Sequence, residues 1–367
     1  MSENYNVDVI VIGAGVIGLA IAKKLAQIGK NVIIIEKENT FGTITSTRNS
    51  GVIHAGIYYD AGSTKAKFCT NGNRALYEYC SKKNVPHKNV GKFVVATSKD
   101  EIEKLESIYS KAKINEVEGI SRVSKEYVHN LEPLVKCYEA LEVKSTGIVD
   151  QQALMRAYIG EFEDSGGMIA YNTIINNIYF EDKRFKIKTS DGTEIYANSV
   201  INSAGLVADN IARLIDGFDL KKIPQIYYAK GNYFETNKKL GIKHLIYPIP
   251  TESSLGLHLG LDISMQIRFG PDVEWVSNLD YRVDPKRIKS FHEDIVKYLP
   301  DIKIEDLRPG YSGIRPKLKS KGEGKSDFCI QTCRTHGLKN LINLFGMESP
   351  GLTSSLVIAD HVSELLS

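Results

Sequence analysis

One short segment gathers the side chains best suited to chemistry. Residues 46–59, STRNSGVIHAGIYY, combine an arginine, an asparagine, two serines, two glycines and a histidine. Neither a helical nor a strand period runs through them, so we expect a loop. The polar groups can donate hydrogen bonds to a ligand, and Gly51 and Gly56 leave room for a flat molecule against the backbone. His54 can exchange a proton near neutral pH, unless it is a structural histidine that only holds the loop.

A second histidine lies in the segment LGLHLGLD, residues 255–262. Its leucines alternate with Gly256, His258, Gly260 and Asp262, so an extended strand would turn the leucines toward a core and His258 toward the other face. Glycines inside a strand often mark the close approach of a ligand. We therefore expect His258 to face a substrate slot. The alternative is a half-exposed strand with an incidental histidine.

An arginine in the segment GIRPKL, residues 313–318, could bind an anion. The pattern predicts that Arg315 lies in a strand that ends at Pro316, because proline cannot donate a backbone hydrogen bond. A guanidinium is planar and always charged, and it pairs with a carboxylate through two parallel hydrogen bonds. Arg315 is therefore a candidate carboxylate ligand, with a surface ion pair as the alternative.

Near the amino terminus, the spacing of glycines predicts a dinucleotide site. An apolar run at 7–12 precedes them, a helical pattern follows to residue 28, and a second apolar run at 31–35 leads into Glu36. The glycines have the spacing G-x-G-x-x-G: Gly13, Gly15 and Gly18. The first permits a tight turn, the second lets a pyrophosphate approach the backbone, and the third allows close helix–strand packing. The helix N-terminus would bind the phosphates and Glu36 the ribose hydroxyls, as in a Rossmann βαβ unit.

The order of these patterns predicts two domains. A strand–turn–helix pattern recurs at 199–215 and again from residue 340, so the nucleotide-binding domain should be discontinuous, formed by residues 1–85, 145–217 and 325–367. Short alternating strands predict a substrate-binding domain at 86–144 and 218–324. The expected fold class is α/β plus α+β, a Rossmann-like domain with an inserted, mostly antiparallel β-sheet domain.

Composition limits the class of protein. The 367 residues are 42% hydrophobic and 25% charged, which is typical of a folded protein. The net charge is +3 and the basic residues are spread out, so we expect no nucleic-acid partner. Five cysteines form no paired framework; Cys329 and Cys333 lie in a segment predicted to be a strand, and we expect reduced thiols and no metal site. No signal peptide is evident, and the apolar run at 9–22 is too short for a transmembrane segment, so a cytoplasmic protein is expected.

The chain resembles the FAD-dependent oxidoreductases of the D-amino-acid-oxidase-like superfamily, which includes glycine oxidase and glycerol-3-phosphate dehydrogenase. The segments that carry the resemblance cover essentially the whole chain: RNSGVIHAGIYY (48–59), NSAGLVAD (202–209), KGNYF (230–234), YPIP (247–250), GLHLG (256–260), FGPD (269–272), GIRPKL (313–318) and SPGLTSSL (349–356). Their order is most similar to the L-2-hydroxyglutarate dehydrogenase/oxidase branch. The resemblance implies FAD rather than NAD.

The resemblance also assigns cofactor-binding residues. They are Gly13, Ala14, Gly15, Val16, Ile17, Gly18, Glu36, Lys37, Thr47, Arg48, Asn49, Ser50, Gly51, Val52, Ala204, Gly205, Gly351, Leu352 and Thr353. The turn at Gly351 begins a second helix, whose N-terminal dipole would stabilise negative charge on a reduced flavin. A terminal helix without a ligand is the alternative.

The implied reaction is oxidation of a small 2-hydroxy acid, L-2-hydroxyglutarate, to the 2-oxo acid by hydride transfer to flavin. Arg315 would bind the 1-carboxylate. A neutral imidazole would take the hydroxyl proton, and His258 is preferred to His54 because its glycine neighbours clear a slot. Further candidates for contact with the substrate are Tyr247, Lys230 and Tyr59.

Other activities stay open on the sequence alone. An amino-acid oxidase like glycine oxidase would use the same arginine, and an enzyme like glycerol-3-phosphate dehydrogenase would share the fold. A nicotinamide dehydrogenase and a non-catalytic flavin-binding module are more distant alternatives. The electron acceptor could be oxygen, a quinone or a carrier protein, and a quinone would require peripheral contact with the inner membrane face.

Overall fold

The computed structural model describes residues 4–250 and 256–366. Leu255, the first leucine of the predicted alternating strand, lies outside the described residues. The chain forms two compact units. The first contains the described residues up to Thr47, Gln151–Tyr228 and the residues from Arg315 onward; the second contains Arg48–Asp150 and Ala229–Ile314.

These boundaries differ from the predicted ones at the polar loop. Residues 48–85 were expected in the nucleotide-binding domain, but they belong to the second unit. The reason is long-range pairing that no local pattern announces. The two-residue strand β3 (Val52–Ile53) pairs with β8 (Gly147–Val149), and Asn73 donates hydrogen bonds to the carbonyls of His54 and Ser145.

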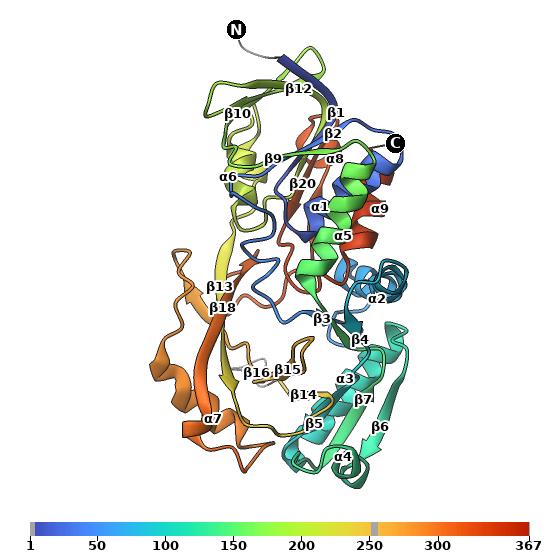
Figure 1. Ribbon diagram of the computed structural model, residues 1–367, viewed down its shortest axis with the longest axis vertical. Coiled ribbons are helices and arrows are strands. Elements are labelled where there is room, and N and C mark those ends of the chain that lie inside the picture. Colours follow the sequence, from blue (N-terminus) through green and yellow to red (C-terminus); the bar gives the residue numbers. More distant parts are fainter. Residues whose placement is uncertain (1–3, 251–255, 367) are drawn as a thin grey trace. The chain divides into compact units, whose positions relative to one another are not determined.

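The first unit is built on a mostly parallel sheet with the strand order β10-β11-β12-β1-β2-β9, and β20 and β19 extend it beside β12. Its strands are β1 (Asn4–Ile12), β2 (Val32–Ile35), β9 (Met168–Ala170), β10 (Ile175–Glu181), β11 (Arg184–Thr189), β12 (Glu194–Asn202), β19 (Cys329–Gln331) and β20 (Leu341–Phe345). Its helices are α1 (Val16–Gln27), α5 (Gln151–Asp164), α6 (Ala208–Arg213), α8 (Cys333–His336) and α9 (Ser355–Leu365). Figure 1 shows α5 and α9 packed on either side of α1.

The predicted βαβ unit is confirmed. Its two strands are apolar and buried, and α1 buries Leu19, Ala20 and Ile21 completely. Such strands are expected when both faces of a parallel sheet are covered. The predicted strand around Cys329 ends earlier than expected, at Gln331, and Cys333 begins the short helix α8; all five cysteines are free thiols.

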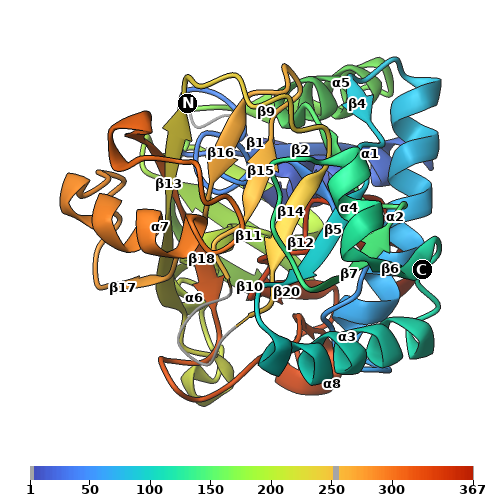
Figure 2. The same ribbon diagram turned by 90° about the horizontal axis from the view of Figure 1, so that it is seen from below.

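The second unit contains a nine-stranded sheet with the order β17-β13-β16-β15-β14-β5-β7-β6, and β18 pairs with β13. Its larger strands are β5 (Lys92–Ala96), β6 (Ile120–Ser124), β7 (Glu139–Val143), β13 (Tyr227–Thr236), β14 (Leu245–Pro248) and β18 (Leu307–Lys317), and the shorter ones are β15 (Leu259–Leu261), β16 (Ile267–Phe269) and β17 (Glu274–Val276). A separate three-stranded sheet has the order β3-β8-β4, with β4 at His87–Lys88. The pairs β13–β16, β16–β15, β15–β14, β5–β7 and β7–β6 are antiparallel and the pair β14–β5 is parallel, so the nine-stranded sheet is mostly antiparallel, as expected for the inserted domain. Figure 2 shows β16, β15, β14 and β5 side by side.

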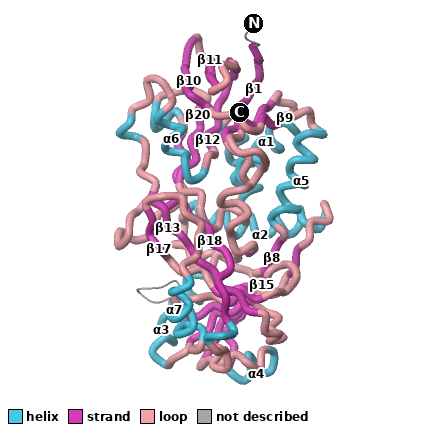
Figure 3. The backbone as a smooth tube through the Cα atoms, turned by 60° about the vertical axis from the view of Figure 1, so that its left-hand side comes forward, coloured by secondary structure: helices cyan, strands magenta, loops and turns pink. Residues whose placement is uncertain are grey.

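Helices cover this sheet on both faces. They are α2 (Thr64–Lys82), α3 (Ile102–Ile114), α4 (Lys125–Leu131) and α7 (Ile288–Ile295). Phe291 of α7 packs in one apolar cluster with Phe93 and Phe234, while Leu105 of α3 packs in another with Val94. Figure 3 shows α3, α4 and α7 around the strands of this unit. Within the described residues, we find no helix with the length and apolar character needed to cross a membrane.

Two predictions about individual strands were wrong. β18 continues past Pro316 to Lys317. It is a sheet edge that pairs with β13, and an edge strand tolerates a residue without a backbone N–H. Within the described part of the alternating segment, only Leu259–Leu261 form a strand, because Gly256 has a φ of +75° and leaves the extended conformation. The predicted alternation is confirmed: the leucines at 257, 259 and 261 are buried, whereas the residues at 258, 260 and 262 are partly exposed.

Candidate active site

Sheet register brings the predicted nucleotide-binding residues of the first unit to one edge. Ile12, the last residue of β1, lies opposite Ile35 of β2 and Asn202 of β12. Since all three strands are parallel, the segments that follow them meet at their carboxyl ends, where α/β folds bind ligands. These segments carry the glycine fingerprint, Glu36, and Ala204 with Gly205.

Two of the fingerprint glycines, Gly13 and Gly18, occupy positions that disfavour any larger residue. Gly13 has a φ of +101° and its amide donates to the carbonyl of Ile35 at 2.8 Å. A Cβ on Gly18 would overlap the Gly13 carbonyl oxygen, so α1 can approach β1 this closely only with glycine there. Gly15 is the N-cap of α1 and supplies no side-chain cap. An oxygen-rich ligand such as pyrophosphate could therefore bind this helix end.

Loop segments hold the fingerprint in place. The carboxylate of Glu36 accepts the backbone N–H of Ala14 at 2.7 Å with one oxygen and that of Glu38 at 2.9 Å with the other. A carboxylate has about four acceptor positions, so Glu36 can still accept from ribose hydroxyls. Lys37 is largely exposed and lies 3.5 Å from the Glu38 carboxylate. Thr47 donates to the Gly42 carbonyl at 2.8 Å, and Gly42 donates to that of Ala14 at 3.0 Å.

The carboxyl-terminal turn of the first unit packs against the same helix. A Cβ on Gly351 would lie 2.8 Å from the Glu348 carbonyl oxygen and 3.3 Å from Ile17 of α1. Thr353 and Ser354 are fully buried at the start of α9, which has no side-chain cap. Among the described residues the Ser354 hydroxyl has no hydrogen-bond partner. A buried hydroxyl and a second uncapped helix start fit a ligand rich in hydrogen-bonding groups, as a dinucleotide is.

The polar loop, Arg48 to Val52, belongs to the second unit, and much of its polarity is used within that unit. The guanidinium of Arg48 lies 4.4 Å from the centre of the Tyr281 ring. Ser50 Oγ is 2.7 Å from the hydroxyl of Tyr233, and Val52 is in β3. The Ser50 contact places the loop against β13, so part of the loop's polarity is already used within the unit.

The same loop is also bound to β18. Tyr311 donates to the Asn49 carbonyl at 2.8 Å, and its ring stacks on Tyr233 with centroids 4.4 Å apart. The Asn49 side chain accepts from the Gly51 amide at 2.8 Å, which closes a tight turn. Gly313 has no room for a side chain, because a Cβ would overlap the Arg48 carbonyl oxygen.

Beyond this turn, His54 lies close to a lysine that we had not predicted to be functional. Lys92 begins β5 and is only 1% exposed. Its Nζ lies 4.7 Å from the centre of the Tyr247 ring and 5.4 Å from that of Tyr58. Burial lowers the Lys92 pKa to about 7, and burial together with the Lys92 charge lowers the His54 pKa to about 3. His54 is therefore a neutral imidazole at neutral pH, the state that can accept a proton.

The other predicted histidine has a different environment. The His258 ring stacks on the Tyr247 ring with centroids 3.6 Å apart and planes 5° apart. The neighbouring Gly256 does not clear space for a ligand as predicted, because a Cβ there would lie 2.7 Å from the Pro248 carbonyl oxygen. A Cβ on Gly260, the other neighbouring glycine, would meet only the Arg268 carbonyl oxygen, at 3.6 Å. The argument that favoured His258 over His54 therefore fails at Gly256 alone, and His258 remains a candidate beside Tyr247.

The remaining substrate candidates lie in different surroundings. Lys230 is buried, donates to the Arg282 carbonyl and lies 3.9 Å from the Glu274 carboxylate. The Tyr59 carbonyl accepts from Asn115 at 2.8 Å, and the residue is partly exposed. Arg315 is partly buried near the end of β18 and belongs to the first unit.

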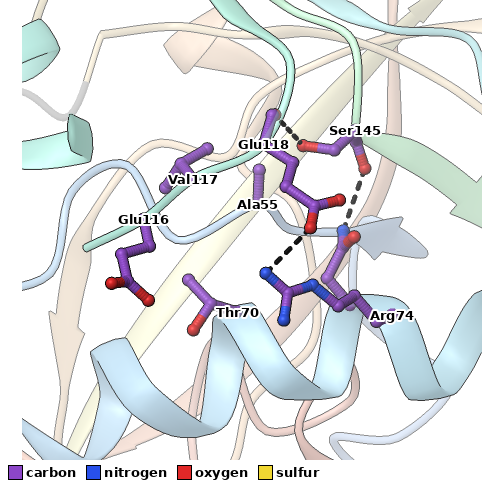
Figure 4. A pocket seen from close by; sticks show the side chains of 8 residues that line it. Ala55, Thr70, Arg74, Glu116, Val117, Glu118 and Ser145 are labelled. Atoms are coloured by element: carbon purple, nitrogen blue, oxygen red, sulfur yellow. Dashed lines mark hydrogen bonds and ion pairs between the residues drawn. The ribbon is translucent and has the colours of Figure 1, made fainter.

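A shallow pocket in the second unit lies beside the His54 backbone. It is lined by Ala55, Thr70, Asn73, Arg74, Glu116, Val117, Glu118 and Ser145 (Figure 4). Arg74 lies 2.8 Å from Glu118 and neutralises it, while Glu116 adds a second carboxylate to the lining. Asn73, which holds the His54 carbonyl at 3.0 Å, is part of this wall. The pocket therefore supports the loop that carries His54.

The fold and the site define a class of protein. The first unit is a Rossmann-type dinucleotide-binding unit, and the second adds an antiparallel sheet with groups that can exchange protons; dinucleotide-dependent oxidoreductases combine these features. The family model described as FAD dependent oxidoreductase (DAO) matches residues 8–365. The chain belongs to this family, and its cofactor is FAD.

Named relatives agree with this assignment. The chain is 40% identical to the mitochondrial L-2-hydroxyglutarate dehydrogenase of Arabidopsis thaliana, over 97% of this chain and 83% of the plant protein. It is 29% identical to the L-2-hydroxyglutarate dehydrogenase of Indibacter alkaliphilus, over 97% and 98% of the two chains. Among solved structures it is similar to the FAD-bound L-alpha-glycerophosphate oxidase of Mycoplasma pneumoniae, with a TM-score of 0.89, 25% identity, and coverage of 98% and 94%.

Proposed function

We propose that this protein oxidises L-2-hydroxyglutarate to 2-oxoglutarate. The observation that carries the proposal is the 40% identity, over 97% of the chain, to a protein named L-2-hydroxyglutarate dehydrogenase. The candidate site residues include two buried lysines, the predicted Lys230 and the newly found Lys92, and such cationic groups suit a substrate with two carboxylates. When bound, FAD supplies the hydride acceptor.

The first unit would hold the cofactor. The fingerprint residues and the start of α1 would bind the pyrophosphate, and Glu36 would accept hydrogen bonds from the ribose. The turn at Gly351, Leu352 and Thr353 would place backbone N–H groups near the ring system. These roles rest on two helix starts whose N-cap residues make no side-chain cap, on the buried Ser354 hydroxyl and on the position of Glu36. At the start of α1, Ser46 Oγ accepts the Val16 N–H at 2.9 Å.

The chain's own groups would bind the substrate and move the proton. Arg315 would orient the substrate through its 1-carboxylate. His54 would take the hydroxyl proton, because burial and the Lys92 charge keep its imidazole neutral. General-base catalysis of this kind contributes about 10²- to 10⁴-fold to the rate. His258 would act through Tyr247, on which it stacks.

An anaerobic titration tests the proposed reaction. Purified holoprotein is mixed with L-2-hydroxyglutarate, its D-isomer, glycerol 3-phosphate and glycine, and the flavin absorbance is followed. We expect L-2-hydroxyglutarate to bleach the flavin fastest and to yield 2-oxoglutarate. Faster bleaching by glycerol 3-phosphate or by glycine would contradict the proposal and favour an activity like those of the glycerophosphate oxidase or glycine oxidase relatives.

Replacing Arg315 with lysine tests its role in binding the carboxylate. Lysine keeps the charge but not the two parallel hydrogen bonds, so we expect KM for L-2-hydroxyglutarate to rise by about 10- to 100-fold with a smaller change in kcat. Arg122, whose side chain forms an exposed ion pair with Glu106, provides the control: the Arg122→Lys variant should leave both constants unchanged. An unchanged KM in the Arg315→Lys variant would remove Arg315 from the site.

Three electron acceptors are to be tested for the reduced flavin: oxygen, a quinone and a carrier protein. The reduced protein can be mixed with oxygen or with a soluble quinone and its reoxidation followed. We further propose that the enzyme works in the cytoplasm, and quinone-dependent reoxidation would add a peripheral contact with the inner membrane face.

A further inference from the structure

Lys92 stands out among the buried lysines. The others have partners: Lys23 lies 3.5 Å from the Glu161 carboxylate, Lys230 lies 3.9 Å from that of Glu274, and Lys65 is also engaged. The side chain of Lys92 forms no hydrogen bond or ion pair with any residue that the structure describes, and its contacts are the faces of Tyr58 and Tyr247. Since an isolated buried charge is costly, buried ammonium groups in proteins are usually paired with an anion.

A hydrogen-bond donor without a partner lies beside this ammonium. The hydroxyl of Tyr58 is buried and has no partner among the residues covered by the structure. Sheet register adds Tyr247 to the group, because Leu245 lies opposite Lys92 and Tyr247 lies opposite Val94, two residues further along the same face. A carboxylate at this place would accept from both the ammonium and a phenol hydroxyl.

We propose that Lys92, together with Tyr58, binds the distal carboxylate of the substrate and thereby selects a dicarboxylic over a monocarboxylic 2-hydroxy acid. This inference rests on the proposed function and deepens it. Lys230, the lysine predicted from the sequence to contact the substrate, already donates to the Arg282 carbonyl and lies 3.9 Å from the Glu274 carboxylate. Lys92 has no such competing partner in the described part of the chain.

Binding at Lys92 would also act on His54. The positive charge of Lys92 contributes to the low pKa of His54. A carboxylate on Lys92 would neutralise this effect and raise the basicity of His54. A substrate without the second carboxylate should therefore lose turnover as well as affinity.

The kinetic experiment compares L-2-hydroxyglutarate with its 5-amide, a neutral molecule of nearly the same shape, in anaerobic flavin reduction. We expect the Lys92→Met variant to lose about 10²-fold in kcat/KM for the acid, while the amide changes by less than about threefold. The Lys144→Met variant is the matched control, since the Lys144 side chain is 66% exposed on the adjacent strand end. It should keep the preference for the acid.

The thermal stability of the Lys92→Met variant separates a substrate-binding role of Lys92 from a purely structural one. The Lys92→Met substitution replaces an unpaired buried ammonium with an apolar side chain of similar size. The melting temperature of the variant holoprotein at pH 7 should therefore be equal to or above that of the wild type. A lysine that only supports the fold would give a lower melting temperature and would affect the acid and the amide equally.

A binding measurement on the unmodified protein gives an independent test. Glutarate, which cannot be oxidised at an alcohol carbon, is titrated into the oxidised holoprotein from pH 6 to 9, with flavin absorbance as the readout. Four titratable groups face Lys92: His54, Tyr58, Cys69 and Tyr247. The pKa of His54 is lowered to about 3 and those of the other three are raised by burial, so none changes charge in this range.

The Lys92 pKa of about 7 then predicts the direction of the effect. The Kd for glutarate should be constant below that pH and should increase by about tenfold per pH unit above it, because binding must then take up a proton. The dependence should vanish in the Lys92→Met variant and persist in the His258→Gln variant.

The outcomes distinguish a wrong substrate from a wrong role for Lys92. If L-2-hydroxyglutarate does not reduce the wild-type flavin, the proposed function and this inference both fall. If it does, but the Lys92→Met variant keeps its preference for the acid or loses the acid and the amide equally, the function stands and the inference is overturned. A flat Kd for glutarate, or a dependence that vanishes in the His258→Gln variant, also overturns it.

Discussion

Replacing His54 with glutamine is expected to slow the reduction of the bound flavin by L-2-hydroxyglutarate by about 10²- to 10⁴-fold. Glutamine keeps a similar size and a hydrogen-bonding end but cannot take up a proton at neutral pH. The pKa of His54, lowered to about 3 by burial and by the Lys92 charge, keeps the wild-type imidazole neutral before substrate binds, and a carboxylate on Lys92 would then raise its basicity for proton uptake. Stopped-flow measurement of the anaerobic flavin reduction reads this rate directly.

Two comparison variants make the result specific. His258→Gln should slow the reduction much less, because the His258 ring is stacked face to face on the Tyr247 ring. His129, which is exposed on α4, supplies a neutral histidine control in the His129→Gln variant. A normal reduction rate in the His54→Gln protein, at unchanged flavin content, would exclude His54 as the base, and a large loss in the His258→Gln protein would transfer that role to His258.

Replacing Gly18 with alanine is expected to remove most of the bound FAD. The added methyl group would overlap the Gly13 carbonyl oxygen and lie 2.8 Å from Ser203 Oγ, so α1 must move away from β1. Overpacking of this kind costs about 1–3 kcal/mol or more, and here the displaced backbone is the predicted pyrophosphate site. The FAD-to-protein ratio of the purified variant and its melting temperature measure the two effects.

Gly160 provides the matched substitution. It is also a helical glycine of the first unit, in α5, and an added Cβ would meet no atom within 4 Å. The Gly160→Ala variant should keep its FAD and gain about 0.5–1 kcal/mol of stability, the usual effect of alanine in a helix. If the Gly18→Ala protein retained FAD as well as the Gly160→Ala protein does, the close packing at the fingerprint would have no bearing on cofactor binding.

The sequence predicted helices and strands correctly where a short contiguous run of residues is compatible with only one local structure. The apolar run before Gly13, the glycine spacing and Glu36 are contiguous, and the βαβ unit they predict is present in β1, α1 and β2. The discontinuous first unit and the mostly antiparallel inserted sheet were also predicted. The limits of the units were less accurate, because the pairing of β3 with β8 joins residues about one hundred positions apart.

What the sequence by itself determined was therefore the nucleotide-binding unit, the family, and the short set of residues able to do the chemistry. These follow from local backbone geometry and from side-chain type. Only the tertiary structure decided which of those residues are already bound by other groups of the protein. It showed that Lys230 is already engaged, that Gly256 makes room for the Pro248 carbonyl, and that Lys92 is buried between two tyrosine rings. In the sequence Lys92 begins an otherwise apolar strand, KFVVA, and that single lysine was the available signal. Its significance depends on burial and on the lack of an anionic partner among the described residues, and both are properties of strands brought together from distant parts of the chain.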